Sequence, residues 1–361
     1  MIMKKIICVI ALMLGVYLNP SSISLNAIGI NEGRLEYTVV SDSTVCVTGN
    51  TLNESISELN IPASVVGPDF KDYNRIKSYS VIGIGERAFL NCTGLISVII
   101  PNSVTSIGER AFYGCIGLTS VTIPNSVTSI GERVFLNCTG LISVIIPNSV
   151  ISIGEQAFYL CTGLTSVTIP NSVTSIGPSA FYGCTGLTNV IFNAENCKTM
   201  GSYDYPVFKN CTNLSSVTIG ENVKDIPSYT FSGCNGLTKV IIGSSVKTIG
   251  NYAFANIERL AKIYLLNPIP PTCASADIFN KVNKDKCTLY VPLGTAEDYK
   301  TTYVWWDFNN IIEKEMSGIE ETIADYAEGE QYYNLQGVRV VNPEHGLYIK
   351  RQGGKTSKVI L

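Results

Sequence analysis

The chain has 361 residues, of which 15% are charged, and its 26 lysines and arginines stand against 29 acidic residues for a formal net charge of −3. Beyond Lys4 and Lys5 there is no basic cluster, which excludes the positive surface that a nucleic-acid partner requires. The single histidine, His345, excludes Ser-His-Asp and Cys-His catalysis and a histidine-based metal site in the repeats. We therefore expect no enzymatic activity, no cofactor and no metal.

Residues 1–27 are predicted to be a secretory signal peptide. Lys4 and Lys5 precede an apolar run from Ile6 to Leu18, and cleavage is placed after Ser24 or Ala27. The run is shorter than the roughly 20 residues of a membrane-spanning helix, and no second apolar span follows. We expect an exported protein without an integral membrane span, extracellular or held at the cell surface.

Residues 28–66 are predicted to form a β-rich N-terminal cap and the first repeat strand. Alternating apolar residues predict strands at 35–40 and 44–48, and 56–61 already has the pattern of a repeat strand. The cap is expected to cover the open end of a repeat stack. The segment 66–80 is interpreted as an insertion that loops out of the first repeat.

Residues 67–286 are dominated by a repeat of 23 residues. Eight blocks begin with phenylalanine, and each of the first four continues with Cys three residues on, Leu three after that, and then the strand-like run Val-x-Ile. A fixed period of this length predicts a solenoid of stacked repeats. One block buries too little apolar surface to fold alone, so stability requires the stack.

Each block is predicted to contain one turn of helix and one strand. In the second block, Ala111, Phe112 and Cys115 have the i, i+1, i+4 spacing of a short helical turn. Leu118–Ile123 has the alternation of a strand, with Thr122 pointing away from the core. The fold expected is an α/β repeat with a parallel sheet on one face and helical turns on the other.

The blocks differ in regularity. Residues 89–134 and 135–180 differ at only seven positions, which indicates a recent duplication of a two-block unit. The block beginning at Phe181 is instead 27 residues long and carries Tyr203 and Tyr205 on a predicted loop. Clustered aromatic residues favour recognition, so these two tyrosines are candidate binding residues.

Seven cysteines share one position of the repeat. The next block has Ile257 at this position, which favours a buried apolar environment, although strands about 5 Å apart also leave disulfides open. A Cys273–Cys287 bridge is a further open alternative. The seven cysteines, interpreted as structural, are Cys92, Cys115, Cys138, Cys161, Cys184, Cys211 and Cys234.

An outward column of the strands alternates Ile and Thr. At about 4.8 Å per strand, an outward Ile recurs every 10 Å or so. The column reflects either β-propensity on a tolerant surface or a weakly apolar face for an extended, repetitive ligand. The candidate binding residues are Ile99, Thr122, Ile145, Thr168, Ile191, Thr218 and Ile241.

Residues 287–315 are predicted to be a C-terminal cap made of a last strand and a short helix. Thr295 and Asp298 have the spacing of a capping box. The aromatic residues that follow are interpreted as cap packing, with recognition as the alternative. Residues 316–330 are predicted to be an acidic linker, and 331–361 a small module of three strands.

The recurring pattern Ile-Pro-x-Ser-Val-x-x-Ile-Gly-x-x-Ala-Phe-x-x-Cys resembles the BspA-type leucine-rich repeats of bacterial surface proteins, over roughly residues 56–291. The resemblance implies a right-handed leucine-rich-repeat solenoid with its parallel sheet on the concave face, helical turns on the convex face and small β-rich caps at both ends. The tail from Tyr333 to Leu361 is similar to the C-terminal sorting module of the type IX export route of Bacteroidetes.

The family resemblance also implies adhesion to extracellular proteins of a host or of other cells. A carbohydrate-binding accessory protein, which would use the aromatic residues of the irregular repeats and the cap, is the alternative. The expected partner is thus an extracellular protein or glycan.

Overall fold

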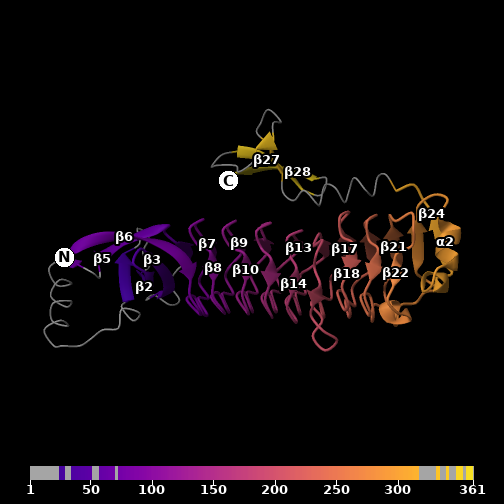
Figure 1. Cartoon of the computed structure of the whole chain (residues 1–361), viewed down its shortest axis with the longest axis horizontal. Helices are drawn as coiled ribbons and strands as arrows, with labels where there is room; N and C mark the ends of the chain where they lie inside the picture. The colour runs from indigo at the N-terminus through magenta and orange to yellow at the C-terminus, as the bar shows by residue number, and fades with distance from the viewer. Residues whose placement is uncertain are drawn as a thin grey trace.

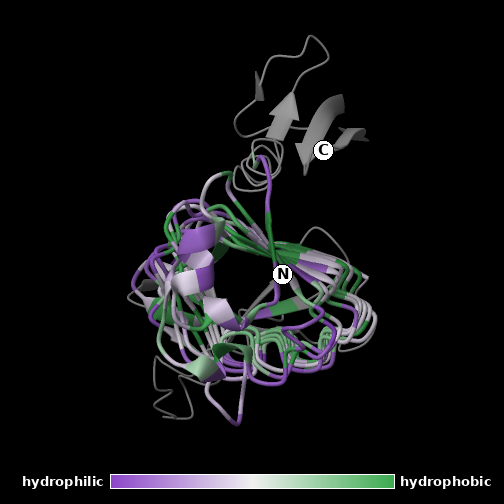
Figure 2. Ribbon diagram, turned by 90° about the vertical axis from the view of Figure 1, so that its right-hand side faces the viewer, coloured by the Kyte–Doolittle hydropathy of each residue, from purple (hydrophilic) through white to green (hydrophobic). Residues whose placement is uncertain are grey.

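The computed structural model describes residues 24–28, 34–50, 57–69 and 72–316, and in the tail 331–333, 339–340, 347–352 and 355–360. Most of the predicted signal peptide and of the predicted acidic linker lies outside these residues. Within the described part of the chain, repeats follow one another along a single axis and form a rod (Figure 1). Viewed along that axis, successive coils superpose (Figure 2).

The N-terminal end of the rod carries a sheet in the order β1-β2-β3-β6-β5. Its strands are β1 (Ser24–Ile28), β2 (Arg34–Ser41), β3 (Thr44–Asn50), β5 (Ser64–Asp69) and β6 (Asp72–Ile84). The expectation that 66–80 loops out was wrong, because β5 and β6 pair as an antiparallel hairpin. Val65, Tyr79 and Val81 are buried, so the alternation of apolar residues holds the hairpin on the core.

The long strands of the coils lie parallel and in register on one side of the rod. Equivalent residues pair, as Val121 does with Val144, because each coil repeats the backbone of the one before. The strands are β4 (Glu58–Asn60), β7 (Ser97–Ile99), β9 (Ser120–Thr122), β11 (Ser143–Ile145), β13 (Ser166–Ile169), β15 (Asn189–Phe192), β17 (Ser216–Ile219), β19 (Lys239–Ile242), β21 (Lys262–Leu265), β23 (Thr288–Val291) and β24 (Asn310–Glu313).

A second side is built from two-residue strands, which also stack in parallel. They are β8 (Ser106–Ile107), β10 (Ser129–Ile130), β12 (Ser152–Ile153), β14 (Ser175–Ile176), β16 (Thr199–Met200), β18 (Asp225–Ile226), β20 (Thr248–Ile249) and β22 (Thr272–Cys273). The glycine that follows each regular short strand lies against the preceding coil. A Cβ on Gly154 would stand 2.7 Å from the carbonyl carbon of Gly131, so only glycine fits.

The third side of the rod consists of turns, so the prediction of helical turns there was wrong. The backbone N–H groups of Arg110, Phe112 and Gly114 donate to carbonyls of the next coil. Those of the residues between them donate three residues back within the coil, and Arg110 has a left-handed φ of 55°. These are hydrogen-bonded turns laddered from coil to coil rather than helix, so the solenoid is β-helix-like with very little helix.

A column of stacked phenylalanines runs through the core. Rings of adjacent coils lie 4.9–5.8 Å apart at small interplanar angles, from Phe89 to Phe279. Trp305 and Phe308 contact the last ring, Phe279, and thereby close the column. The period of 23 places one large aromatic residue in every coil, and offset stacking makes these contacts favourable.

At the C-terminal end lie η2 (Ala276–Phe279), α2 (Ala296–Thr301) and η3 (Trp305–Asp307). The predicted capping box is wrong: Thr295 makes no side-chain cap, and its hydroxyl donates to the Pro292 carbonyl. The Glu313 carboxylate from β24 accepts from the Ala296 N–H instead. A carboxylate at this end of a helix is favoured by both the free N–H groups and the helix dipole.

The described tail strands form an antiparallel sheet in the order β26-β25-β27-β28. They are β25 (Gln331–Tyr333), β26 (Arg339–Val340), β27 (Leu347–Gln352) and β28 (Lys355–Ile360). The structure thus has four strands where three were predicted. No helix within the described ranges combines the length and apolarity that a membrane crossing requires.

Candidate functional site

The outward strand face is exposed in the N-terminal half of the rod. Ile99 is 63% and Ile145 45% exposed, and Ile96 and Ile142, three residues earlier in the same two coils, are also exposed. Thr122, in the coil between them, is exposed as well, and Thr168 is half-buried. The structure therefore brings four exposed isoleucines together across β7, β9 and β11.

In the C-terminal half the same column is covered, so the expectation of a continuous outward face was wrong there. Ile191, Thr218 and Ile241 are all buried. Ile241 packs in a separate apolar cluster with Leu266 and Met316. The chain that leaves β24 thus lies against this part of the face, which the period of the repeat cannot reveal.

Lys314 fixes the position of this exit segment. Its ammonium lies 5.6 Å from the ring centres of both Tyr264 and Tyr290, and these two rings stack at 4.6 Å. Cation–π attraction therefore acts beside the buried Met316 side chain. Residues 314–316 bind to the outward face by contacts that only the last coils offer.

Threonine hydroxyl groups at the edge of the exposed face donate hydrogen bonds to the backbone of the preceding coil. The Thr119 hydroxyl donates to the Ile96 carbonyl at 3.1 Å, and the Thr165 hydroxyl donates to the Ile142 carbonyl at 3.3 Å. Each links one coil to the coil before it. The isoleucine side chains have no such structural role, so they are the groups of this face left for a ligand.

The seven repeat cysteines are buried and unbridged. From Cys115 onward each thiol donates to the carbonyl of a phenylalanine in the preceding coil, at 3.1 Å for Cys115, Cys138, Cys161 and Cys184. Burial raises the pKa of Cys161 to about 12. Such thiols remain protonated at neutral pH and are poor nucleophiles.

The described cysteines outside the repeat position, Cys46, Cys197, Cys273 and Cys287, are also free. Burial raises the pKa of the Cys273 and Cys287 thiols to about 12. Among the described residues, no group of three or more His, Cys, Asp or Glu residues has a geometry that could hold a metal ion.

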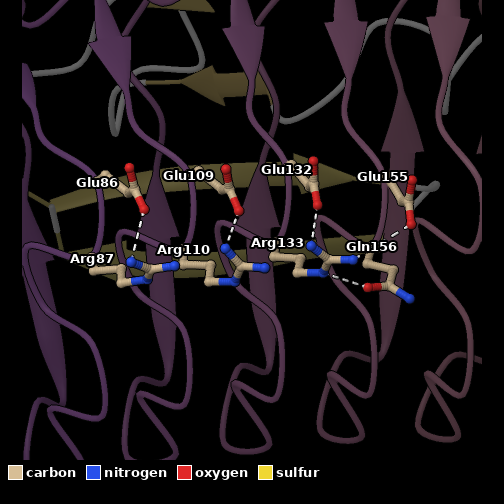
Figure 3. A network of polar contacts seen from close by, with 8 residues as sticks. All are labelled: Glu86, Arg87, Glu109, Arg110, Glu132, Arg133, Glu155 and Gln156. Atoms are coloured by element: carbon tan, nitrogen blue, oxygen red, sulfur yellow. Dashed lines mark hydrogen bonds and ion pairs between the residues drawn. The ribbon is translucent and has the colours of Figure 1, made fainter.

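A row of glutamate–arginine ion pairs follows the third side of the rod, formed by the turns, along the first coils (Figure 3). Arg87 pairs with Glu86 at 3.0 Å, and Arg110 and Arg133 pair with the glutamates that precede them. Arg133 also reaches the next coil, where its Nε donates to Gln156 at 2.6 Å. These ion pairs are partly exposed, and pairs of this kind add little stability.

The residue two positions before each phenylalanine forms a column that changes from arginine to tyrosine along the rod. Seven of its eight members have left-handed φ angles of 54–62°, and the remaining coil has Pro206 at this position. Because the ladder to the next coil holds this backbone conformation, the side chain there is free to vary. The column reads Arg87, Arg110, Arg133, Gln156, Ser179, Pro206, Tyr229 and Tyr252.

The extra residues of the long block place Tyr203 on these later tyrosines. Tyr229 and Tyr252 stack at 5.5 Å, and the Tyr203 ring meets them edge-on at 6.1 and 6.0 Å. Tyr203 is nevertheless 66% exposed. Tyr205 is 59% exposed and has no ring contact within the described part, so the structure separates the two predicted tyrosines.

A groove of about 450 Å³ opens beside Tyr203. Its lining is mainly polar and comes from the long loop between β16 and β17 (Figure 1) and the turns of the next three coils. The lining residues are Tyr203, Asp204, Pro206, Lys209, Asn210, Ser232, Gly233, Asn235, Asn256, Glu258 and Lys281.

The predicted aromatic cluster of the C-terminal cap divides in two. Tyr299 and Trp305 are buried, and their polar atoms donate to the carbonyls of Asn267 and Pro271. Tyr303 and Trp306 remain exposed as an edge-on pair at 5.6 Å. The first pair belongs to the core, as the cap-packing interpretation expects.

Sequence reasoning missed Tyr229, Tyr252 and most of the groove. Aligning the blocks on the residue two before each phenylalanine would have found the change from Arg to Tyr in one column. The groove has no such signal, because it depends on where four extra residues of one block fold.

The model of the BspA type leucine-rich repeat region matches residues 82–206 and 188–286, in six copies over the two ranges. No curated protein matches the chain. Among solved structures, it is similar to a leucine-rich repeat protein from Bacteroides ovatus, with 25% identity and a TM-score of 0.49 over 80% of this chain and 76% of that one.

Two further similar structures are a T. pallidum leucine-rich repeat protein and a leucine-rich cell surface protein from Faecalibacterium prausnitzii. The first is 25% identical with a TM-score of 0.45, over 63% of this chain and 87% of that chain. The second is 23% identical with a TM-score of 0.32, over 81% and 96%. All three TM-scores lie below 0.5, so the family assignment rests on the match to the repeat model.

The matched repeats cover more than half of the chain. Repeats of this family form protein-binding scaffolds and are typical of surface proteins. The chain therefore belongs to the BspA-type leucine-rich repeat proteins.

Proposed function

We propose that this protein is an exported adhesin that binds extended segments of extracellular proteins through the exposed strand face of β7–β11. The observation that carries the proposal is the set of four exposed isoleucines at positions 96, 99, 142 and 145. β-propensity alone does not require them, because the coils between and after carry Thr at the same positions. Exposed apolar groups gathered on one face favour a contact surface.

The spacing of the isoleucines favours an extended polypeptide. Ile96 and Ile99 are three residues apart in one coil, about 10 Å along a strand, and the equivalent pair lies two coils away, again about 10 Å. A ligand in the polyproline II conformation, with three residues per turn and about 3.1 Å per residue, presents every third side chain on one face about 9 Å apart, which matches this spacing. Such a ligand crossing the strands contacts both pairs at once.

A binding experiment with substitutions already present in neighbouring coils tests the proposal. Full-length protein with Ile96, Ile99, Ile142 and Ile145 all changed to Thr is compared with the wild type on immobilised extracellular-matrix proteins and on whole cells. We expect at least tenfold weaker binding, since several apolar contacts are lost.

The matched control is the double variant Ile116→Thr and Ile151→Thr. Both isoleucines are exposed but lie off the strand face, and other blocks carry Thr at both positions. This control is expected to bind like the wild type. Equal loss in both variants, or no binding of the wild type to any matrix protein or cell, contradicts the proposal.

Export and surface display belong to the same proposal. The basic and apolar N-terminal segment and the tail similar to a type IX sorting module support them. Fractionation of expressing cells, with N-terminal sequencing of the exported form, checks both. Protein retained inside the cell with Met1 intact contradicts this part.

A second candidate function, glycan binding, is favoured by one specific observation. Tyr203 is largely exposed, is held by two other tyrosines and borders a polar groove. An exposed aromatic ring next to amides and charged groups is a combination suited to the apolar and hydroxyl faces of a sugar.

A further inference from the structure

We propose that the groove beside Tyr203 binds a neutral glycan segment of about disaccharide size, with Tyr203 as its stacking surface. This inference rests on the second candidate function and concerns a site separate from the strand face. The volume of about 450 Å³ lies in the range of pockets that hold small ligands.

The backbone around the groove leaves recognition to side chains. The N–H groups of Phe231 and Gly233 already donate to the carbonyls of Ala253 and Ala255 in the next coil. The described backbone around the groove thus leaves no free strand edge at which a peptide could add a strand. Sizeable apolar surface in the lining comes from Tyr203 and Pro206, which offers a peptide few apolar pockets.

The polar lining matches hydroxyl-rich ligands. Asn235 and Asn256 provide amides that can donate and accept, as sugar hydroxyls do. Asn210 is oriented by its own hydrogen bond, since its Nδ2 donates to the Tyr182 hydroxyl at 2.7 Å. An amide held in this way loses little conformational freedom when its carbonyl oxygen accepts from a ligand hydroxyl.

The charges favour a neutral ligand over an acidic one. Lys209 and Lys281 face the same groove as Asp204 and Glu258, and none of the four makes an ion pair with a described residue. An anionic sugar gains from the two ammonium groups and is repelled by the two carboxylates. A neutral sugar instead accepts hydrogen bonds from the lysines and donates to the carboxylates.

Two ring contacts hold the Tyr203 side chain in a position where a sugar ring can stack on it. Edge-on contacts with Tyr229 and Tyr252 fix its ring, so little conformational freedom is lost when a ligand stacks on it. The hydrogen bond and the negative charge of Asp277 raise the pKa of Tyr252, whose hydroxyl therefore stays neutral over the physiological range.

An array of neutral and acidic oligosaccharides tests the proposal with full-length protein, followed by titration calorimetry with the best neutral binder. We expect neutral hexose or N-acetylhexosamine glycans to bind. Tyr203→Ala is expected to weaken binding at least tenfold and Glu258→Gln several-fold. Tyr205→Ala, on the same loop, is the matched control and is expected to stay within twofold; melting curves check that each variant is folded.

The outcomes separate the site from the function. Binding that persists in Tyr203→Ala overturns the groove assignment and leaves glycan binding standing. Binding of acidic glycans alone overturns the neutral class. A blank array overturns both this inference and the second candidate function, while the matrix-protein experiment remains independent of it.

Discussion

The Sγ atom of Cys115 lies 3.1 Å from the carbonyl oxygen of Phe89 in the preceding coil and donates a hydrogen bond to it. The same bond recurs in the following coils, so a thiol and a phenylalanine carbonyl join each pair of neighbours in the core. Buried thiols that donate in this way contribute to the stack only while they are protonated.

The first prediction is a loss of stability at alkaline pH. Burial raises the pKa of Cys161 from 9.0 to about 12, so the folded state holds this proton more tightly than the unfolded chain. The contribution is complete below pH 9 and is lost as the pH rises from 9 to 12, by about 2 kcal/mol at pH 10.5. Denaturant unfolding at pH 7.5 and 10.5 measures it.

Cys161→Val is the control, since the last block carries Ile at this position. Its free energy of unfolding should fall less between the two pH values than that of the wild type. Titration of thiols in denaturant, with and without prior reduction, should give the same count. A lower count without reduction would show disulfides and contradict the thiol interpretation.

The second prediction concerns the close approach of successive coils. Gly154→Ala places a methyl group 2.7 Å from the Gly131 carbonyl carbon and 2.8 Å from the Glu132 nitrogen. We expect a loss of about 1–3 kcal/mol in the free energy of unfolding, because backbone cannot move aside as a side chain can. Thr128→Ala, at an exposed position, should change it by less than about 0.5 kcal/mol. Equal stability of the two variants contradicts the packing argument.

The third prediction concerns the helix α2. The Ala296 N–H and other backbone donors lower the pKa of Glu313, so its carboxylate stabilises the folded state above pH 4.5 and loses this effect as the pH falls below that value. Glu313→Ala should lower the melting temperature at pH 7 and much less at pH 3.5. Glu313→Gln retains an acceptor oxygen and should show an intermediate loss. A loss that is equal at both pH values would exclude a role for the charge.

The fourth prediction concerns the segment that leaves β24. Met316→Ala removes the side chain that packs on Ile241 and Leu266, and should lower the free energy of unfolding by about 2 kcal/mol. It should also increase the binding of an apolar fluorescent dye, because Ile241 becomes accessible. Glu315→Ala, its exposed neighbour, should have neither effect. Unchanged dye binding in Met316→Ala argues against this coverage.

The period of 23 was enough to predict the stack, the parallel register and the outward position of Thr122, because each follows from repetition alone. It was not enough for the turn side. Ala111, Phe112 and Cys115 have helical spacing, yet Arg110 takes a left-handed φ that its sequence does not signal. Ladder bonds to the next coil stabilise that conformation, and they exist only in the assembled stack.

The candidate surfaces show the same limit. The exposure of Ile99 could be predicted from alternation within a strand, whereas the burial of Ile191 and Ile241 could not. Met316, which covers Ile241, lies 75 residues further along the chain, and no period relates the two. Contacts between regular and irregular segments depend on tertiary packing and not on local pattern.

The duplicated unit of two coils has a consequence for the spacing of surfaces on the molecule. Each added pair lengthens the rod by about 10 Å while every coil keeps the same neighbours, so insertion disturbs neither end. Each unit carries its own exposed isoleucine pair, so the number of units sets how far the isoleucine face extends from the Tyr203 groove. Recombination between the nearly identical segments 89–134 and 135–180 can change this extent in whole steps without any new packing.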